Sequence, residues 1–257
     1  KGSNFNGVFG DNLGYSVSLS SDGSIVAIGA NNSSDGPGYN RGKVLIYQWS
    51  GTSWNQKGSA IYGKANVDTS GESVSLSSDG SIVAIGGMGY EPYGNGSGHV
   101  RIYEWSGSAW IQKGSDIKGE TDVDGSGSSV SLSSDGSIVA IGAPNNSSYS
   151  GQVRIYQWSG TAWTQKGSDI HGEADFDNSG SGVSLSSDGS IVAIGARRND
   201  GNGDNVGHVR VFGFQIDTDG DGIIDYQDLC SLIPNGMIGH SLIEGKHHKT
   251  TDGGETW

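Results

Sequence analysis

The sequence predicts an all-β fold built from four copies of one unit. The block SVSLSSDGSIVAIGA occurs with small changes at residues 16–30, 73–87, 129–143 and 182–196, so the unit recurs every 53–57 residues. Glycine supplies 46 of the 257 residues, far above its usual share of about 7%. No stretch keeps a helical hydrophobic period over three turns. A repeat of this length is typical of arrays in which each copy forms one sheet.

Within each unit the pattern predicts four short antiparallel strands. In the third unit, residues 129–133 alternate serine with apolar residues, as in a strand with one buried face. The Ser-Asp-Gly sequence at 134–136 predicts a tight turn, and the β-branched run 138–141 predicts a strand covered on both faces. Residues 152–158 and 163–170 predict a third and a fourth strand.

Repeated four-stranded sheets of this kind are the blades of a β-propeller. We therefore predict a propeller over residues 1–214, with blades at about 8–63, 64–119, 120–172 and 173–214. The fourth unit lacks the WxQKGS strand of the others, whereas residues 1–7 (KGSNFNG) match that strand. We expect this N-terminal strand to complete the last blade, either in cis or in trans in a neighbouring molecule. The second arrangement would give a linear polymer.

The charge and the apolar content limit the partners. The formal net charge is −13, which disfavours nucleic acid and favours cations, although solubility explains the acidic residues equally well. No segment approaches the ~20 apolar residues of a membrane span. Cys230 is the single cysteine, so it is free or pairs outside this chain. Because the chain begins at Lys1, we expect a processed product or a fragment, compatible with a removed export signal.

Several motifs in the propeller region resemble the FG-GAP repeats of integrin-α-like propellers. Residues 9–10 (FG) and 14–16 (GYS) correspond to the first half of that repeat, and residues 141–144 (IGAP) to the second, followed by a GxVxIY strand. The second unit departs from the pattern with GGM at 86–88. The DxDxDG calcium loop frequent in that family is replaced by Ser-Ser-Asp-Gly, and its usual seven blades by four. The resemblance implies extracellular or cell-surface adhesion or scaffolding.

Residues 217–228 read DTDGDGIIDYQD and have the spacing of an EF-hand calcium loop. The expected oxygen ligands are Asp217, Asp219, Asp221, the Ile223 carbonyl, Asp225 and Asp228. Five carboxylates in one loop repel one another without a cation, so we predict Ca²⁺ as a cofactor bound at 215–229, with an acidic linker as the alternative. The segment also resembles thrombospondin type 3 calcium repeats, which place a cysteine shortly after the loop. Residues 230–257 form a C-terminal tail.

Three further patterns have two interpretations each. An aspartate stands three residues before a glycine in every unit, and it either caps a turn or belongs to a ring of cation ligands; these are Asp11, Asp68, Asp124 and Asp177. The repeated Trp and Tyr residues either pack between blades or bind sugar. Glycosylation sequons stand in the loops between the second and third strands, at Asn31, Asn32, Asn95, Asn145 and Asn146, and such short motifs also arise by chance.

No nucleophile motif, phosphate loop or zinc pattern is present in the sequence, so we expect a protein that is not an enzyme. The leading hypothesis is a calcium-stabilised propeller for adhesion or scaffolding, with a cell-surface or matrix glycan or protein as partner. The second is a self-assembling subunit of an extracellular filament, joined by strand or tail exchange. The third is a carbohydrate-binding or carbohydrate-active propeller.

Overall fold

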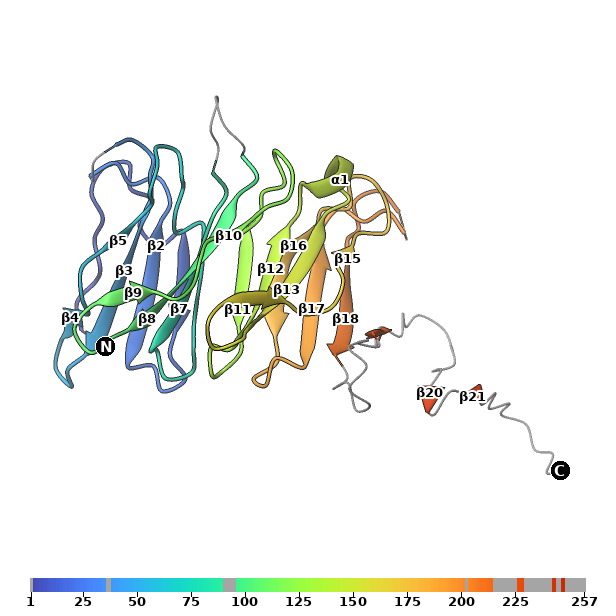
Figure 1. Ribbon diagram of the computed structural model, residues 1–257. Coiled ribbons are helices and arrows are strands. Elements are labelled where there is room, and N and C mark those ends of the chain that lie inside the picture. The colour runs from blue at the N-terminus through green and yellow to red at the C-terminus, as the bar shows by residue number, and fades with distance from the viewer. Residues whose placement is uncertain are drawn as a thin grey trace.

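The computed structural model describes residues 2–35, 38–89, 96–201 and 203–214, together with strand segments at 226–228, 242–243 and 246–247. Four antiparallel sheets stand side by side in chain order, with the first and the fourth at opposite ends of the array (Figure 1). The predicted all-β, blade-repeat architecture is therefore confirmed. Among the described residues, no helix has the length and apolar character needed to cross a bilayer.

The strands of the four sheets follow the repeats. The first sheet contains β1 (Ser16–Leu19), β2 (Ile25–Ala30), β3 (Lys43–Trp49), β4 (Trp54–Gln56) and β5 (Ile61–Tyr62). The second contains β6 (Ser73–Leu76), β7 (Ile82–Gly87), β8 (His99–Trp105), β9 (Trp110–Gln112) and β10 (Ile117–Lys118). The third contains β11 (Ser129–Leu132), β12 (Ile138–Ala143), β13 (Gln152–Trp158), β14 (Trp163–Gln165) and β15 (Ile170–His171), with α1 (Asn146–Tyr149) between β12 and β13. The fourth contains β16 (Ser179–Leu185), β17 (Ile191–Ala196), β18 (His208–Phe214) and β19 (Tyr226–Asp228), and β20 (Leu242–Ile243) pairs with β21 (Lys246–His247).

The Ser-Asp-Gly turn builds the first hairpin of each blade. In the first blade, Asp22 accepts hydrogen bonds from the Ser24 backbone N–H at 2.8 Å and from the Ser20 hydroxyl at 2.7 Å. These bonds lower the pKa of Asp22 to about 2. Gly23 adopts a φ of 65°, a conformation that glycine tolerates without strain. The sequence therefore determines this turn locally.

The outer strand of each of the first three blades is divided into two. In the first blade, β4 and β5 both pair with β3, at opposite ends of it, and residues 57–60 between them are not in a strand. The same division recurs in the second and third blades. The fourth predicted strand of each unit is thus present but interrupted at its Lys-Gly-Ser segment.

The apolar core lies between neighbouring sheets. We call the side of a blade that meets the next blade its forward face; in the first blade it carries Ile25, Ala27, Val44 and Ile46. The side that meets the preceding blade is the backward face; in the second blade it carries Val74, Leu76, Val83 and Ile85. These two faces form one buried cluster, and equivalent clusters join blades two to three and three to four. The IVAI runs contribute to both faces, which explains their continuous hydrophobicity.

The expectation that residues 1–7 complete the last blade in cis is wrong for this structure. Phe5 lies against the first blade, with its ring centroid 4.6 Å from that of Tyr47. At the other end of the array, β18 pairs with β19, which comes from residues 226–228. Residues 2–7 are not in a strand. The sequence of this segment matches an outer strand but does not specify which blade it joins. Completion in trans stays a prediction.

Candidate functional site

A buried recurrent aspartate lies in each segment that leads into a blade: Asp11 precedes β1, and Asp68, Asp124 and Asp177 lie in the three connections between blades. These connections lie along one edge of the array, at the top of Figure 1. Every one of these carboxylates accepts a hydrogen bond from a backbone N–H three or four residues earlier. The pairs are Val8 to Asp11 at 3.3 Å, Lys64 to Asp68 at 2.6 Å, Glu120 to Asp124 at 2.8 Å and Ala174 to Asp177 at 3.0 Å. The aspartates thus cap their loops, as the turn-capping interpretation predicts, but through an earlier N–H and not through the Asx-turn bond to the residue two positions later.

Each capped aspartate also receives a side-chain donor from the same blade. The pairs are Lys43 to Asp11 at 2.8 Å, Arg101 to Asp68 at 2.6 Å, Asn146 to Asp124 at 3.1 Å and Asn199 to Asp177 at 2.9 Å. The carboxylates therefore hold the connections against their blades. Within the described residues, no group of three or more His, Cys, Asp or Glu side chains is arranged to hold a metal ion.

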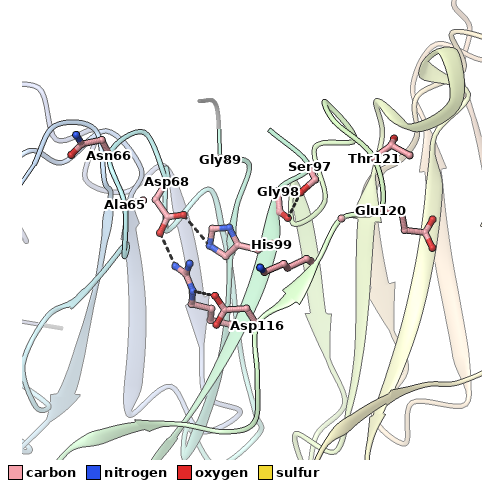
Figure 2. A pocket seen from close by; sticks show the side chains of 13 residues that line it. Ala65, Asn66, Asp68, Gly89, Ser97, Gly98, His99, Asp116, Glu120 and Thr121 are labelled. Carbon is pink, nitrogen blue, oxygen red and sulfur yellow. Dashed lines mark hydrogen bonds and ion pairs between the residues drawn. The ribbon is translucent and has the colours of Figure 1, made fainter. Parts of the chain in front are cut away.

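A pocket of about 470 Å³ opens beside the second of these aspartates. In Figure 2 the Asp68, His99 and Asp116 side chains converge on one place in this pocket. The Arg101 guanidinium contacts both carboxylates, with Nη1 2.6 Å from Asp68 and Nε 2.9 Å from Asp116. Lys64 Nζ lies 2.8 Å from the other oxygen of Asp116. The pocket is thus built around an ion-pair network that links a connection to β8 and to the segment before β10.

The titration behaviour of this pocket is set by burial and by these ion pairs. Burial lowers the pKa of His99 to about 4, so its imidazole is neutral at pH 7. Its Nε2 lies 3.4 Å from Asp68 Oδ1 and has no hydrogen-bond partner within the described part of the chain. Burial opposes ionisation of Asp116, but hydrogen bonds from Lys64, Arg101 and Gln112 hold its pKa well below the usual range. Neither group has the near-neutral pKa that suits a general acid or base.

An exposed aromatic pair lies along the same edge as the connections, between the third and fourth blades. The rings of Tyr149 and Phe176 are stacked, with centroids 6.0 Å apart and planes 12° apart. The two residues are 45% and 61% exposed. Tyr149 is the last residue of α1, which Figure 1 shows at this edge, and Phe176 directly precedes the capped Asp177.

The backbone holds this pair in place. Phe176 N–H donates to Ser148 O at 3.2 Å, and Asn178 N–H donates to Tyr149 O at 2.8 Å. Tyr149 and Phe176 have φ values of 63° and 69°. A positive φ is uncommon for bulky residues and carries a conformational cost that surrounding contacts must offset. The loops therefore present two apolar rings to solvent in a fixed arrangement.

The repeated Trp residues have a different role from this pair. In each of the first three blades two indoles pack against one another, and Trp110 and Trp163 also contact the buried clusters. Trp110 Nε1–H donates to Lys57 O of the preceding blade at 2.8 Å. The prediction that these aromatics pack between blades is confirmed.

Most of the predicted calcium site lies outside the described residues. Asp217, Asp219, Asp221, Ile223 and Asp225 belong to this undescribed part. Asp228 lies in β19, where it is paired with Phe212 of β18. Calcium binding at 217–228 stays a prediction.

Of the sequons, Asn95 lies outside the described residues, and Asn145 is half-buried. Asn31 and Asn32 are also half-buried, and their side-chain amides donate to Glu72 and to the Gly10 carbonyl at 2.8 and 2.9 Å. Asn146 is 4% exposed and bonds Asp124, so a glycan there is incompatible with the folded loop. The sequon at Asn146 is therefore a structural asparagine, because its amide caps the connection.

The pocket network and the exposed pair were not among the sequence predictions. Arg101 occupies a strand position whose neighbours are apolar, and its two acidic partners are separated from it by 33 and 15 residues. For Phe176 a signal exists: the equivalent positions before Asp68 and Asp124 hold Val67 and Val123. An aromatic residue replacing valine at a fixed loop position marks the site.

Comparison with known proteins supports the fold and nothing finer. No protein-family model matches the chain, and no curated protein matches its sequence. Among solved structures, the periplasmic gluconolactonase PpgL of Pseudomonas aeruginosa is similar with a TM-score of 0.52 and 19% identity, over 82% of this chain and 55% of that one. Kuenenia stuttgartiensis hydrazine synthase gives a TM-score of 0.49 and 13% identity, over 88% of this chain and 49% of that one. The chain thus spans about half the length of these structures. The four sheets and the similarity to the gluconolactonase show a β-propeller-like fold.

Proposed function

We propose that this chain is a non-catalytic propeller that acts in adhesion or scaffolding at the cell surface or in the extracellular space. The observation that carries the proposal is the exposed, stacked Tyr149–Phe176 pair. Rigid aromatic rings offer a large contact area with little loss of side-chain entropy on binding. The resemblance of residues 9–16 and 141–144 to FG-GAP repeats supports the same role, since that family acts in extracellular adhesion.

The chemistry of the loop-bearing edge favours binding over turnover. Asp116 is held ionised by Arg101 and Lys64, and His99 is kept neutral by burial. Asp124 and Asp177 are occupied as turn caps, although their spacing from Asp122 and Asp175 resembles that of paired acids. A glycosidase requires one carboxyl group that keeps a proton near neutral pH. Asp116, Asp124 and Asp177 have the surroundings of structural carboxylates.

The partner we propose is a cell-surface or matrix glycan, bound against the two rings. Fluorescently labelled protein is applied to a glycan array and, in parallel, to immobilised matrix proteins. We expect selective glycan signals, and the double variant Y149A/F176A should lose about tenfold or more in affinity, the loss typical of two contact residues in a binding site. Tyr62, an exposed tyrosine on β5, provides the control Tyr62→Ala, which should bind as the unmodified chain does.

Two results would overturn the proposal. The first is an absence of binding to both surfaces by protein that is folded by circular dichroism. The second is equal binding by Y149A/F176A and the unmodified chain. Binding to matrix proteins alone, lost in the double variant, would keep the site and replace the glycan with a protein partner.

A further inference from the structure

The array ends in two apolar faces that have no neighbouring blade among the described residues. On the backward face of the first blade, Val17 and Leu19 are 64% and 60% exposed. Their equivalents in the second blade, Val74 and Leu76, are 8% and 7% exposed because the first blade covers them. Val26 and Ile28, the equivalents of Val83 and Ile85, stay buried at 8% and 4% exposed, so the uncovered part of this face is the β1 strand.

The forward face of the fourth blade shows the same contrast. Ile191 is 39% exposed, and Val209 is 58% exposed. The equivalent residues of the second blade are Ile82 and Val100, which are 6% and 0% exposed beneath the third blade. Each end of the array thus exposes one half of a junction that is complete elsewhere.

The two exposed halves are complementary because all three internal junctions join a forward face to a backward face. Polar contacts in those junctions are as regular as the apolar ones. The backbone N–H of Leu76, Leu132 and Leu185 donates to Ser18, Ser75 and Ser131 of the preceding blade at 2.9, 2.9 and 3.0 Å. At the ends, Ser184 is the exposed equivalent of the serines, and Leu19 is the equivalent of the leucines.

The N-terminal segment already lies where a preceding blade would place its outer strand. A side chain at Gly2 would meet the rings of Trp49 and Trp54 at 2.9 and 3.0 Å. Gly58, from the outer segment of the first blade, is held in the same way by Trp105 and Trp110 at 2.7 and 3.0 Å. Residues 2–5 therefore lie against the first blade in the place that the outer segment of a preceding blade takes at the internal junctions.

We propose that the occupant of each end face is a second copy of this chain, joined head to tail. The forward face of the fourth blade of one copy packs on the backward face of the first blade of the other, and Ser184 accepts the Leu19 N–H across the joint. This contact is heterologous, so it forms a closed ring or an open filament according to the rotation between copies. Two copies supply eight blades, within the range of four to eight in known propellers, so we expect the ring.

A mixed-disulfide experiment tests the joint directly. In the internal junctions the serine Oγ lies 2.9–3.0 Å from the leucine N, which brings the two Cα atoms within the roughly 4.4–6.8 Å that a disulfide bridges. Two variants, Ser184→Cys and Leu19→Cys, are prepared separately with Cys230→Ser, mixed and oxidised. We expect a covalent dimer of twice the 26.6 kDa chain mass that requires both variants, because neither chain alone contains the pair.

Two controls fix the interpretation. Ser75→Cys with Leu132→Cys in one chain should give an intramolecular disulfide, since this pair is the internal equivalent. Ser184→Cys mixed with Ile111→Cys should give only background cross-linking, because Ile111 is exposed on β9, away from both end faces.

A second measurement uses no cysteine. Leu19→Asp should convert the assembly to single chains in light scattering, whereas Ile111→Asp should not. Assemblies of more than two chains in light scattering of the unmodified protein, together with the 184–19 disulfide, support the joint and show that two copies do not close a ring. A folded protein that stays monomeric at high concentration and forms no 184–19 disulfide overturns the proposal, and further blades of a longer polypeptide then become the expected occupants.

Discussion

The internal junctions and the end faces of this molecule are made from the same residues but differ in burial. Val100 of the second blade is 0% exposed, whereas the equivalent Val209 of the fourth is 58% exposed. Since the local sequences HVRIY and HVRVF are nearly the same, the difference arises from the neighbouring blade and not from the strand itself. In repeat arrays, stability is approximately the sum of such nearest-neighbour interfaces. This comparison predicts which substitutions are costly.

The largest effect is expected from truncating these two valines. Val100→Ala removes fully buried methyl groups and leaves a cavity, so it should lower the free energy of unfolding by about 2 kcal/mol. Val209→Ala should change it by less than about 0.5 kcal/mol in dilute protein. Urea denaturation of both variants at low concentration measures the difference. Equal losses would show that the end face is covered in solution even at that concentration.

The repeats made most of the fold predictable. The local pattern of residues 129–141 predicts a strand, a tight turn and a second strand. The turn hydrogen bonds of Asp135 and the strand pairing agree with that prediction. The division of the outer strand was missed although Gly167, with a φ of 73°, stands at the break, because an isolated glycine in a strand pattern is also compatible with a bulge. The partner of residues 1–7 is left open for a different reason: their sequence matches an outer strand, which any blade with a free position can accept.

The candidate site was less predictable than the fold. The recurrent aspartates were recognised as turn caps, because a repeated Asp before Gly has a local structural explanation. The Asp68–Arg101–Asp116 network depends on three segments that meet only after the blade is folded. The exposed position of Phe176 depends on a left-handed backbone, which sequence patterns indicate for glycine but not for aromatic residues.

The second prediction uses one strand position that differs between blades. His99 opens β8, and the equivalent position of the third blade holds Gln152. Because burial lowers the pKa of His99 to about 4, against about 6.5 in an unfolded chain, the unfolded state binds more protons between these pH values. The free energy of unfolding that depends on neutral His99 is therefore fully present above pH 6.5, and it is lost as the pH falls toward 4.

His99→Gln should remove this dependence. Between pH 7 and pH 5 the unmodified chain should lose about 1–2 kcal/mol more stability than the variant. Thermal or urea unfolding across the pH series measures the gap. The neighbouring groups Lys64, Asp68, Arg101 and Asp116 are common to both proteins, so their titration cancels in the comparison. Parallel curves for the two proteins would mean that His99 is accessible to protons in the folded state.

The smallest effect is expected from removing one serine hydroxyl, either at an internal junction or at the exposed end. Ser75→Ala leaves the Leu132 N–H without its acceptor in an internal junction, which should cost about 1 kcal/mol. Ser184→Ala removes the equivalent hydroxyl at the exposed end, where it should leave the stability of dilute protein unchanged. If the end faces join two copies, Ser184→Ala should instead weaken association, visible as a higher concentration needed for the assembled mass. Ser75 and Ser184 occupy equivalent positions but should have different roles. The internal serine stabilises the folded chain, and the terminal one stabilises contact between chains. A loss of unfolding free energy in Ser184→Ala that does not vary with concentration would contradict this division.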